Sequence, residues 1–169
     1  LSQAGDTNAS RFVRLFEEVW QPADGKLPHH LLDGSQKGGI AATVKSLGDQ
    51  ARKADGFFLA SPALAGQVQP AMTYYGLNIP LFSLSTAWEP SADISTRQDL
   101  DGLAFCGMPW LLADERPEQQ ALYQAQPRPQ ANHDRLYALG ADAWTVASAL
   151  PRVRAGHPLS LRTGQLRLN

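Results

Sequence analysis

The chain has 169 residues, and its 43% hydrophobic content is enough for one domain with a real core. Fifteen lysines and arginines stand against sixteen acidic residues, so the net charge of −1 offers no broad attraction for nucleic acid or an anionic membrane. The single cysteine excludes an internal disulfide and therefore neither requires nor excludes an oxidising compartment.

No apolar run approaches the roughly 20 residues that span a bilayer, and no secretory leader opens the chain. The first residues, LSQAGD, lack a Met and resemble the end of a strand followed by a turn. We therefore expect a soluble piece cut from a longer protein. Its clearest charge asymmetry is that no acid follows Asp142, whereas four arginines do, and we interpret this as a solvated basic edge: Arg152, Arg154, Arg162 and Arg167.

The first fifty residues predict helix, strand and helix. From Ser10, apolar residues repeat at three-and-four spacing, so we expect an amphipathic helix capped by Asn8 or Ser10 and ended by Pro22 and Gly25. Residues 29–33 are short and apolar-centred, as in a strand. The next helix follows the Gly38-Gly39 pair and should bury one stripe: Ile40, Val44, Leu47 and Ala51.

The middle of the chain repeats this alternation. GFFLAS, residues 56–61, reads as a strand covered on both faces, and Ser61-Pro62 as a capped helix start. Gly76 should end that helix in a left-handed conformation, and IPLFSLS, residues 79–85, is the next strand. The buried stripe of the helix should be Leu64, Val68, Met72 and Tyr75. Since the spacers suit crossover helices better than hairpins, we predict an α/β fold, a three-layer sandwich around a parallel sheet.

The last third is less regular. A polar loop at 88–98 precedes DLDGLAFCGMPWLL, whose LAFCGM segment reads as a strand, and residues 116–131 suggest a brief helix and a connector. HDRLYALGADAWTVASAL predicts a helix with Gly140 at a close packing point and Pro151 as its stop. Its buried stripe should be Leu136, Leu139, Ala143, Val146 and Leu150. In TGQLRLN, Leu166 and Leu168 alternate as in an edge strand.

No pattern in the sequence indicates catalysis, a metal or a cofactor. Cys106 lies in an apolar run, which predicts a buried small hydrophobe, and His29 and His30 should leave opposite faces of a strand. The serine contexts lack G-x-S-x-G, and no phosphate-binding loop is complete. His133 and His157 read as surface positions. We expect structural or solvated roles for the carboxylates, Asp142 included, and predict that the chain is not an enzyme.

Four residues at the carboxyl ends of the expected parallel strands are candidates for a ligand cleft: Ser61, Ser85, Thr86 and Trp88. Open α/β sheets place their ligand crevice at that edge, where hydroxyls and an aromatic ring could orient a small molecule. The alternative interpretation, which we favour, is that Ser61 only caps a helix and Trp88 anchors a loop.

The order of segments resembles the later part of a type I periplasmic binding protein. LDGLAFCGMPWLL and LYALGADAW are similar to the LppC/LpoA lipoprotein family, and the likeness covers nearly the whole chain. It implies one fragment, residues 1–169, with 1–108 mainly the second lobe, 109–160 returning helices and 161–169 the final strand. The lipobox, a helical-repeat domain and the first strands of the other lobe are not in the sequence. Met108, Pro109 and Trp110 would form a hinge, with Pro109 interrupting the strand ladder and Trp110 packing at the lobe junction.

The resemblance also implies a function. It suggests a non-catalytic periplasmic regulator of peptidoglycan synthesis that binds and activates a class A penicillin-binding protein. The full-length protein would be anchored at the outer membrane by a lipid outside this fragment. Two alternatives stay open: a receptor for a small molecule such as an amino acid, amide or peptidoglycan fragment, and a hydrolase or transferase on the same scaffold. Amino-acid and muropeptide stabilisation would favour the receptor.

Overall fold

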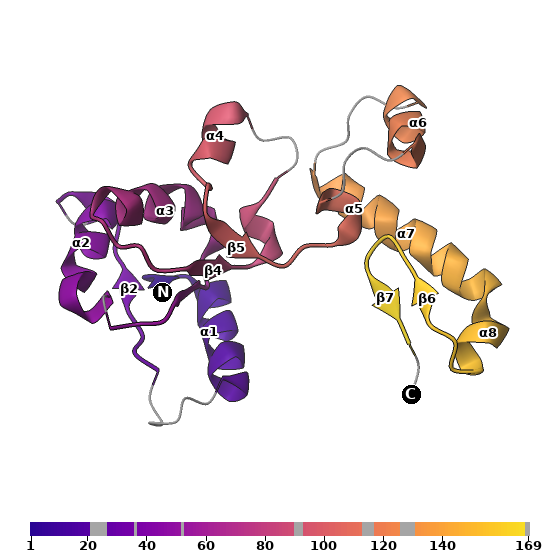
Figure 1. Ribbon diagram of the computed structural model, residues 1–169, viewed down its shortest axis with the longest axis horizontal. Helices are drawn as coiled ribbons and strands as arrows, with labels where there is room; N and C mark the ends of the chain where they lie inside the picture. The colour runs from indigo at the N-terminus through magenta and orange to yellow at the C-terminus, as the bar shows by residue number, and fades with distance from the viewer. Residues whose placement is uncertain are drawn as a thin grey trace. The chain divides into compact units, whose positions relative to one another are not determined.

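The computed structural model describes residues 1–20, 27–35, 37–51, 53–89, 93–112, 117–125 and 131–167. The chain divides into two units, Leu1–Trp88 with Ala92–Cys106 and Gly107–Asn169 with Glu89–Ser91 (Figure 1). Within the described ranges, no helix is long and apolar enough to cross a membrane.

The first unit alternates strands with helices, as expected. Its elements in chain order are β1 (Ser2–Gln3), α1 (Thr7–Val19), β2 (Leu31–Leu32), α2 (Gly39–Ala51), β3 (Phe57–Leu59), the 3₁₀ helix η1 (Pro62–Leu64), α3 (Ala65–Tyr74), β4 (Leu81–Ser83), the 3₁₀ helix η2 (Ser85–Ala87), α4 (Ile94–Gln98) and β5 (Leu103–Phe105). The predicted polar loop at 88–98 is wrong in its last part, because Asp93 accepts a hydrogen bond from the Thr96 N–H and begins α4.

Two parallel ladders make up one sheet. β1 pairs with β2, and β4 lies between β3 and β5. Leu1 joins the ladders: its nitrogen donates to the Phe58 carbonyl at 2.7 Å, and its carbonyl accepts from the Ala60 N–H at 2.8 Å. The strand order is therefore β2-β1-β3-β4-β5. The predicted α/β fold with a parallel sheet is confirmed.

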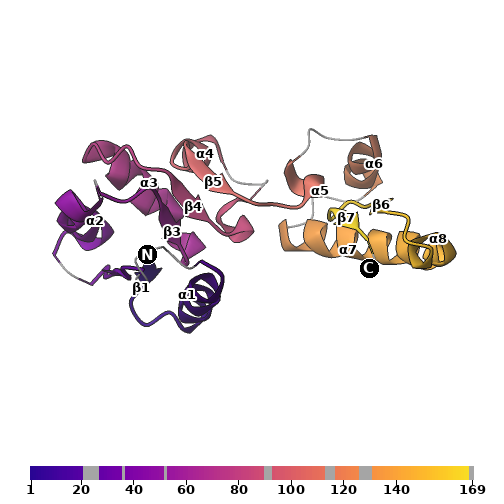
Figure 2. The ribbon, with the colours of Figure 1, turned by 60° about the horizontal axis from the view of Figure 1, so that its bottom comes forward.

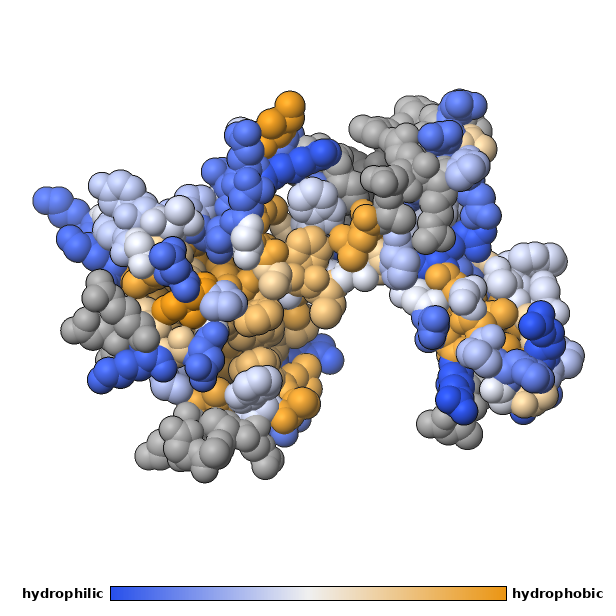
Figure 3. Space-filling view, in the orientation of Figure 1, coloured by the Kyte–Doolittle hydropathy of each residue, from blue (hydrophilic) through white to orange (hydrophobic). Residues whose placement is uncertain are grey.

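Helices cover the two faces of this sheet unequally (Figure 2). Phe58 stacks on Phe16 of α1, with ring centroids 4.5 Å apart. The flanking residues of β3, Phe57 and Leu59, belong to the core with α2 and α3 on the other face, since successive strand residues alternate. On the α1 face Phe82, the ladder partner of Phe58, is 48% exposed, and apolar side chains are open on the surface (Figure 3).

Local sequence signals set most helix ends in this unit. Gly76 (φ +66°) donates to the Thr73 carbonyl and Leu77 to the Met72 carbonyl, the paired bonds of a left-handed helix end, so the prediction for Gly76 is confirmed. The predicted start of α1 is wrong: the helix begins at Thr7, and Asp6 rather than Asn8 or Ser10 caps it. Pro22 and Gly25 lie outside the described residues.

The predicted buried stripes of α2 and α3 hold. All four α2 residues are buried, from Ile40 to Ala51. Leu64, Val68 and Met72 are buried too, and Tyr75 is half-buried. His29 and His30 are not part of a strand, since β2 contains only Leu31 and Leu32.

The second unit is mainly helical. It contains α5 (Pro109–Leu112), α6 (Pro117–Ala125), α7 (Ala131–Ser148), α8 (Leu150–Arg154) and an antiparallel pair, β6 (Leu159–Ser160) with β7 (Gln165–Leu166). The expected LAFCGM strand is too long, because β5 ends at Phe105. Pro109 does not interrupt a ladder: it opens α5, where its missing N–H costs no hydrogen bond.

The predicted buried stripe of α7 is wrong. Leu136 and Leu139 are 64% and 58% exposed, whereas Asp134, Ala138 and Asp142 are buried. A Cβ at Gly140 would meet nothing within 4 Å, so this glycine is not a close packing point. Pro151 lies near the start of α8 instead of ending α7. Leu166 is half-buried as an edge strand requires, and Leu168 lies outside the described residues.

Candidate functional site

The strand order of the first unit defines where a ligand crevice would lie. From β1 the chain crosses through α1 to β2 on one side, and from β2 it returns through α2 to β3 on the other side of β1. The carboxyl ends of β1 and β3 therefore flank the point where the winding reverses. Ligands of doubly wound sheets bind at such a point. Ser61 follows β3 at this point, where the sequence analysis placed it as a candidate for the ligand cleft.

The polar atoms at this point form hydrogen bonds with other groups of the same chain. The Ser61 hydroxyl accepts from the Gln3 N–H at 2.8 Å and donates to the Asp6 carboxylate at 3.1 Å, and Ser61 is 1% exposed. Ser61 occupies the N-cap position of η1 before Pro62, as predicted, but its side chain makes no capping hydrogen bond to that helix. Ser61 instead ties the end of β3 to the turn between β1 and α1.

Asp6 completes this link. Its other carboxylate oxygen accepts from the Ala9 N–H at 3.0 Å, which caps α1. That backbone hydrogen bond is the main cause that lowers the pKa of Asp6, burial acts in the opposite direction, and the Ser61 hydroxyl adds to the lowering. The carboxylate is therefore held ionised as a structural acceptor.

The other three cleft candidates lie together at the end of β4. Ser85 and Thr86 belong to η2, which packs beside η1, and Trp88 follows directly. Thr86 is exposed, and Ser85 and Trp88 are half-buried. The Trp88 ring stacks on Phe105 with centroids 6.1 Å apart, and the Arg97 guanidinium lies 5.7 Å from its ring centre. Trp88 Nε1 is buried and has no hydrogen-bond partner among the described residues. Ligand binding here remains a prediction.

In the described part of the first unit, the reactive side chain of Cys106 lies apart from that of His29. Cys106 is exposed, so its prediction as a buried hydrophobe is wrong; it lies just beyond the last residue of β5. His29 shares a hydrogen bond with the Ser2 hydroxyl at 2.8 Å. Across the described ranges, no three His, Cys, Asp or Glu side chains come close enough to hold a metal ion.

A second polar arrangement surrounds Trp110 in the second unit. Trp110 is fully buried. Its backbone N–H donates to the Arg162 carbonyl at 3.0 Å, and its backbone carbonyl accepts from the Gln119 side chain. The ring centroids of Tyr137 and Trp110 are 5.5 Å apart, and the Arg162 guanidinium lies 5.8 Å from the centre of the Trp110 ring. Trp110 thus joins α5, α6, α7 and the loop between β6 and β7.

Asp142 fixes that loop to α7. The carboxylate is 3% exposed and accepts from the backbone N–H groups of Arg162 and Thr163 at 2.9 and 2.7 Å. Burial alone would raise its pKa, but these hydrogen bonds outweigh burial, and the pKa of Asp142 lies below its ordinary value. The Arg162 guanidinium also pairs with Asp142 and Glu118, at 3.5 and 2.8 Å. The predicted structural role of Asp142 is therefore supported.

Sequence reasoning did not predict the roles of Asp6 and Gln119, and its interpretation of Arg162 as part of a solvated basic edge is wrong, because Arg162 pairs with Glu118 and Asp142. Asp6 precedes the helix at a spacing that suits a cap, so its signal was present in the sequence. Arg162 and Gln119 had no local signal, because their partners lie 20 and 9 positions away, at Asp142 and Trp110.

The strand order β2-β1-β3-β4-β5, with helices on both faces, makes the first unit a doubly wound α/β lobe. The family model "LppC putative lipoprotein" matches residues 33–169. The chain belongs to the LppC family.

Two curated relatives are each called "Penicillin-binding protein activator LpoA", from Edwardsiella piscicida and Klebsiella pneumoniae subsp. pneumoniae. Each is 31% identical over 120 residues, which cover 67% of this chain and 17% of the relative. The chain therefore spans only about a sixth of their length.

Solved structures share the fold. Full-length LpoA from Haemophilus influenzae superposes with a TM-score of 0.72 at 20% identity, over 99% of this chain and 31% of that one. The C-domain of the Haemophilus protein, described as a regulator of PBP1A, gives a TM-score of 0.70 at 20% identity and is covered to 53%.

Proposed function

We propose that the protein containing this chain binds and activates a class A penicillin-binding protein, and that it does so without catalysis. It would act in the periplasm, anchored at the outer membrane by a lipid. The observation that carries the proposal is the LppC match over residues 33–169, together with relatives named as activators. The geometry supports the non-catalytic part of the proposal, because the polar atoms of Ser61 and Asp6 form hydrogen bonds within the fold.

A hinge at Met108, Pro109 and Trp110 is part of this proposal. The chain passes from one unit to the other between Cys106 and Gly107, immediately before these residues. Trp110 is buried by groups of the second unit, so it would serve as the anchor of that unit at the hinge. The assignment of 1–108 mainly to a second lobe, 109–160 to returning helices and 161–169 to a final strand belongs to the same proposal.

The test uses the full-length protein and the periplasmic part of a class A penicillin-binding protein from the same organism. We expect saturable binding by biolayer interferometry and an increase in glycan-strand or cross-link formation by the synthase. A synthase that neither binds the protein nor changes its rate would contradict the proposal.

A receptor for a small ligand is the second candidate, and one observation favours it. Trp88 Nε1 is a buried donor without a partner among the described residues, and Trp88 directly follows η2, which contains Ser85 and Thr86. A ligand carbonyl or carboxylate could accept from it. Concentration-dependent thermal stabilisation by amino acids or muropeptides, lost in Trp88→Phe, would support this function. Absence of any shift with these compounds would reject it.

A further inference from the structure

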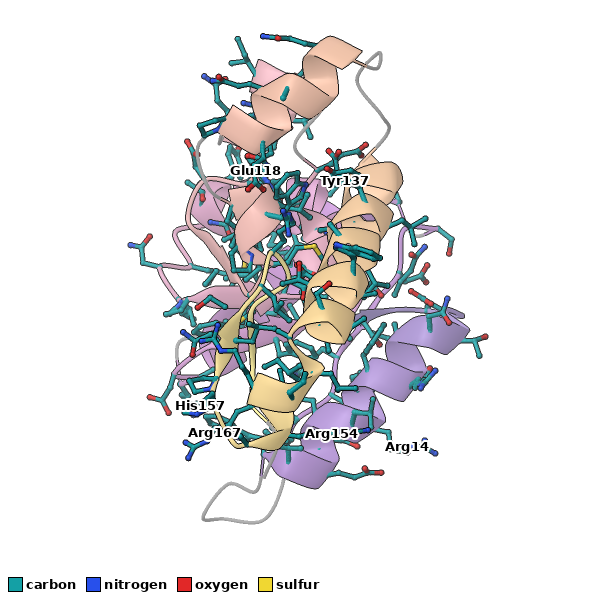
Figure 4. The ribbon with its side chains drawn as sticks, turned by 90° about the vertical axis from the view of Figure 1, so that its right-hand side faces the viewer. Arg14, Glu118, Tyr137, Arg154, His157 and Arg167 are labelled. Atoms are coloured by element: carbon teal, nitrogen blue, oxygen red, sulfur yellow. The ribbon has the colours of Figure 1, made fainter. Side chains whose placement is uncertain are left out.

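Three arginines and one histidine lie at one end of the second unit, which we call the basic end: Arg152, Arg154, Arg167 and His157. Arg152 and Arg154 occupy the last turn of α8, and the His157 N–H donates to the Arg152 carbonyl at 3.2 Å. Continuing the register of β6 and β7 places Arg167 opposite Pro158, beside His157. Figure 4 shows Arg154, His157 and Arg167 together at this end.

These side chains have no partners in the described part of the chain. All four residues are exposed, and none of the three arginines takes part in an ion pair or a side-chain hydrogen bond there. Arg162 differs, because it pairs with Glu118 and Asp142. Between Asp142 and Arg167 the sequence contains no acidic residue.

Stabilisation of α8 accounts for only part of this arrangement. Cations in the last turn of a helix interact favourably with its carbonyl end, which explains Arg152 and Arg154. Arg167 directly follows β7, where no helix end needs a charge, and His157 lies just beyond the end of α8. The hairpin thus adds positive charge to a place where the helix already has two cations.

We propose that the basic end is the surface on which an acidic patch of the synthase partner docks. This inference rests on the proposed function. The guanidinium groups of α8 and of the residue after β7 can pair with carboxylates in a bidentate way. A compact patch on a chain of net charge −1 suits one discrete acidic patch, whereas a long polyanion needs cations along an extended track.

The experiment compares two charge-reversal variants of the full-length protein. Arg154→Glu/Arg167→Glu alters the basic end, and Arg11→Glu/Lys37→Glu makes the same change in net charge at exposed residues of the first unit. Binding to the periplasmic part of a class A penicillin-binding protein is measured by biolayer interferometry at 50 and 300 mM salt. We expect the first variant to bind at least tenfold more weakly, mainly through a slower association rate, with less salt dependence. The control should stay within twofold of wild type.

The outcomes separate this inference from the proposed function. Wild-type binding that the first variant retains would overturn the docking surface and leave the proposed function standing. Absence of wild-type binding would overturn the proposed function itself. Retained synthase binding with lost binding to isolated peptidoglycan would overturn the inference in favour of a polysaccharide surface. Circular dichroism of both variants shows whether their folds are intact.

Discussion

The core of the first unit is aliphatic, whereas the core of the second is one tryptophan in a polar frame. Around the parallel sheet, side chains such as Leu32, Val44 and Leu59 are fully buried. The buried hydrophobic residues described in the second unit are Trp110, Ala138 and Val153, accompanied by buried Gln119, Asp134 and Asp142. The first core is therefore tolerant of similar apolar shapes, and the second depends on particular donors and acceptors.

Truncation of Trp110 should have the largest effect on stability, and it should affect the second unit without affecting the first. Trp110→Ala removes a fully buried ring and should lower the free energy of unfolding of the second unit by about 4 kcal/mol. Amide hydrogen exchange should rise in α5, α7 and β6 but not in α2 or α3. Trp144→Ala, at a residue that is 76% exposed, is the control and should change little. Equal loss in both units would mean that they unfold together.

The carboxylate of Asp142 should make the second unit sensitive to acid. Asp142→Asn should cost roughly 2 kcal/mol at pH 7, because a neutral amide replaces the acceptor of two backbone N–H groups. The pKa of Asp142 in the folded state lies below the ordinary value of about 4. The stabilisation by this carboxylate is therefore complete above pH ~4 and is lost as the pH falls through the folded-state pKa.

Urea unfolding followed by hydrogen exchange of α7 between pH 7 and 2 measures this effect. Wild type should lose the Asp142 stabilisation on acidification, and Asp142→Asn should show a shallower loss. Parallel pH curves for the two proteins would contradict the assignment of the charge to this contact.

The Ser61 link should contribute less. Ser61→Ala removes the acceptor for the Gln3 N–H and the donor to Asp6, so we expect a loss of about 1 kcal/mol in the first unit. Exchange of the Gln3 amide should become faster. Ser10→Ala, which removes an exposed hydroxyl bonded to the Asp6 carbonyl, is the matched control. An unchanged Gln3 amide in Ser61→Ala would show that another group protects it.

The exposed face of α7 should tolerate polar substitution. Leu139→Gln should change the stability of the second unit by less than about 0.5 kcal/mol, because Leu139 is 58% exposed. The same substitution one position earlier, Ala138→Gln, places a polar side chain at a fully buried position and should be clearly more destabilising. If Leu139→Gln lowered the melting temperature more than Ala138→Gln, the buried stripe predicted from the sequence would be correct after all.

The accuracy of the sequence-based predictions followed the type of core. In the first unit, strand segments, crossover spacing and the stripes of α2 and α3 led directly to the observed fold, because an aliphatic core leaves its period in the sequence. In α7 the same reasoning selected Leu136 and Leu139, which are exposed, since the buried face carries Asp134, Ala138 and Asp142. Periodicity of apolar residues cannot identify a face that is buried through hydrogen bonds.

The sequence by itself determined the α/β class, the left-handed helix end at Gly76 and the family resemblance, because these depend on neighbours along the chain. Tertiary structure alone decided that Ser61 bonds to Asp6, that Cys106 is exposed, and that Asp142 and Arg162 hold the hairpin of β6 and β7 against α7. Those contacts join groups 20 to 55 positions apart. Their geometry exists only after the chain has folded, since no local propensity specifies which distant donor meets which acceptor.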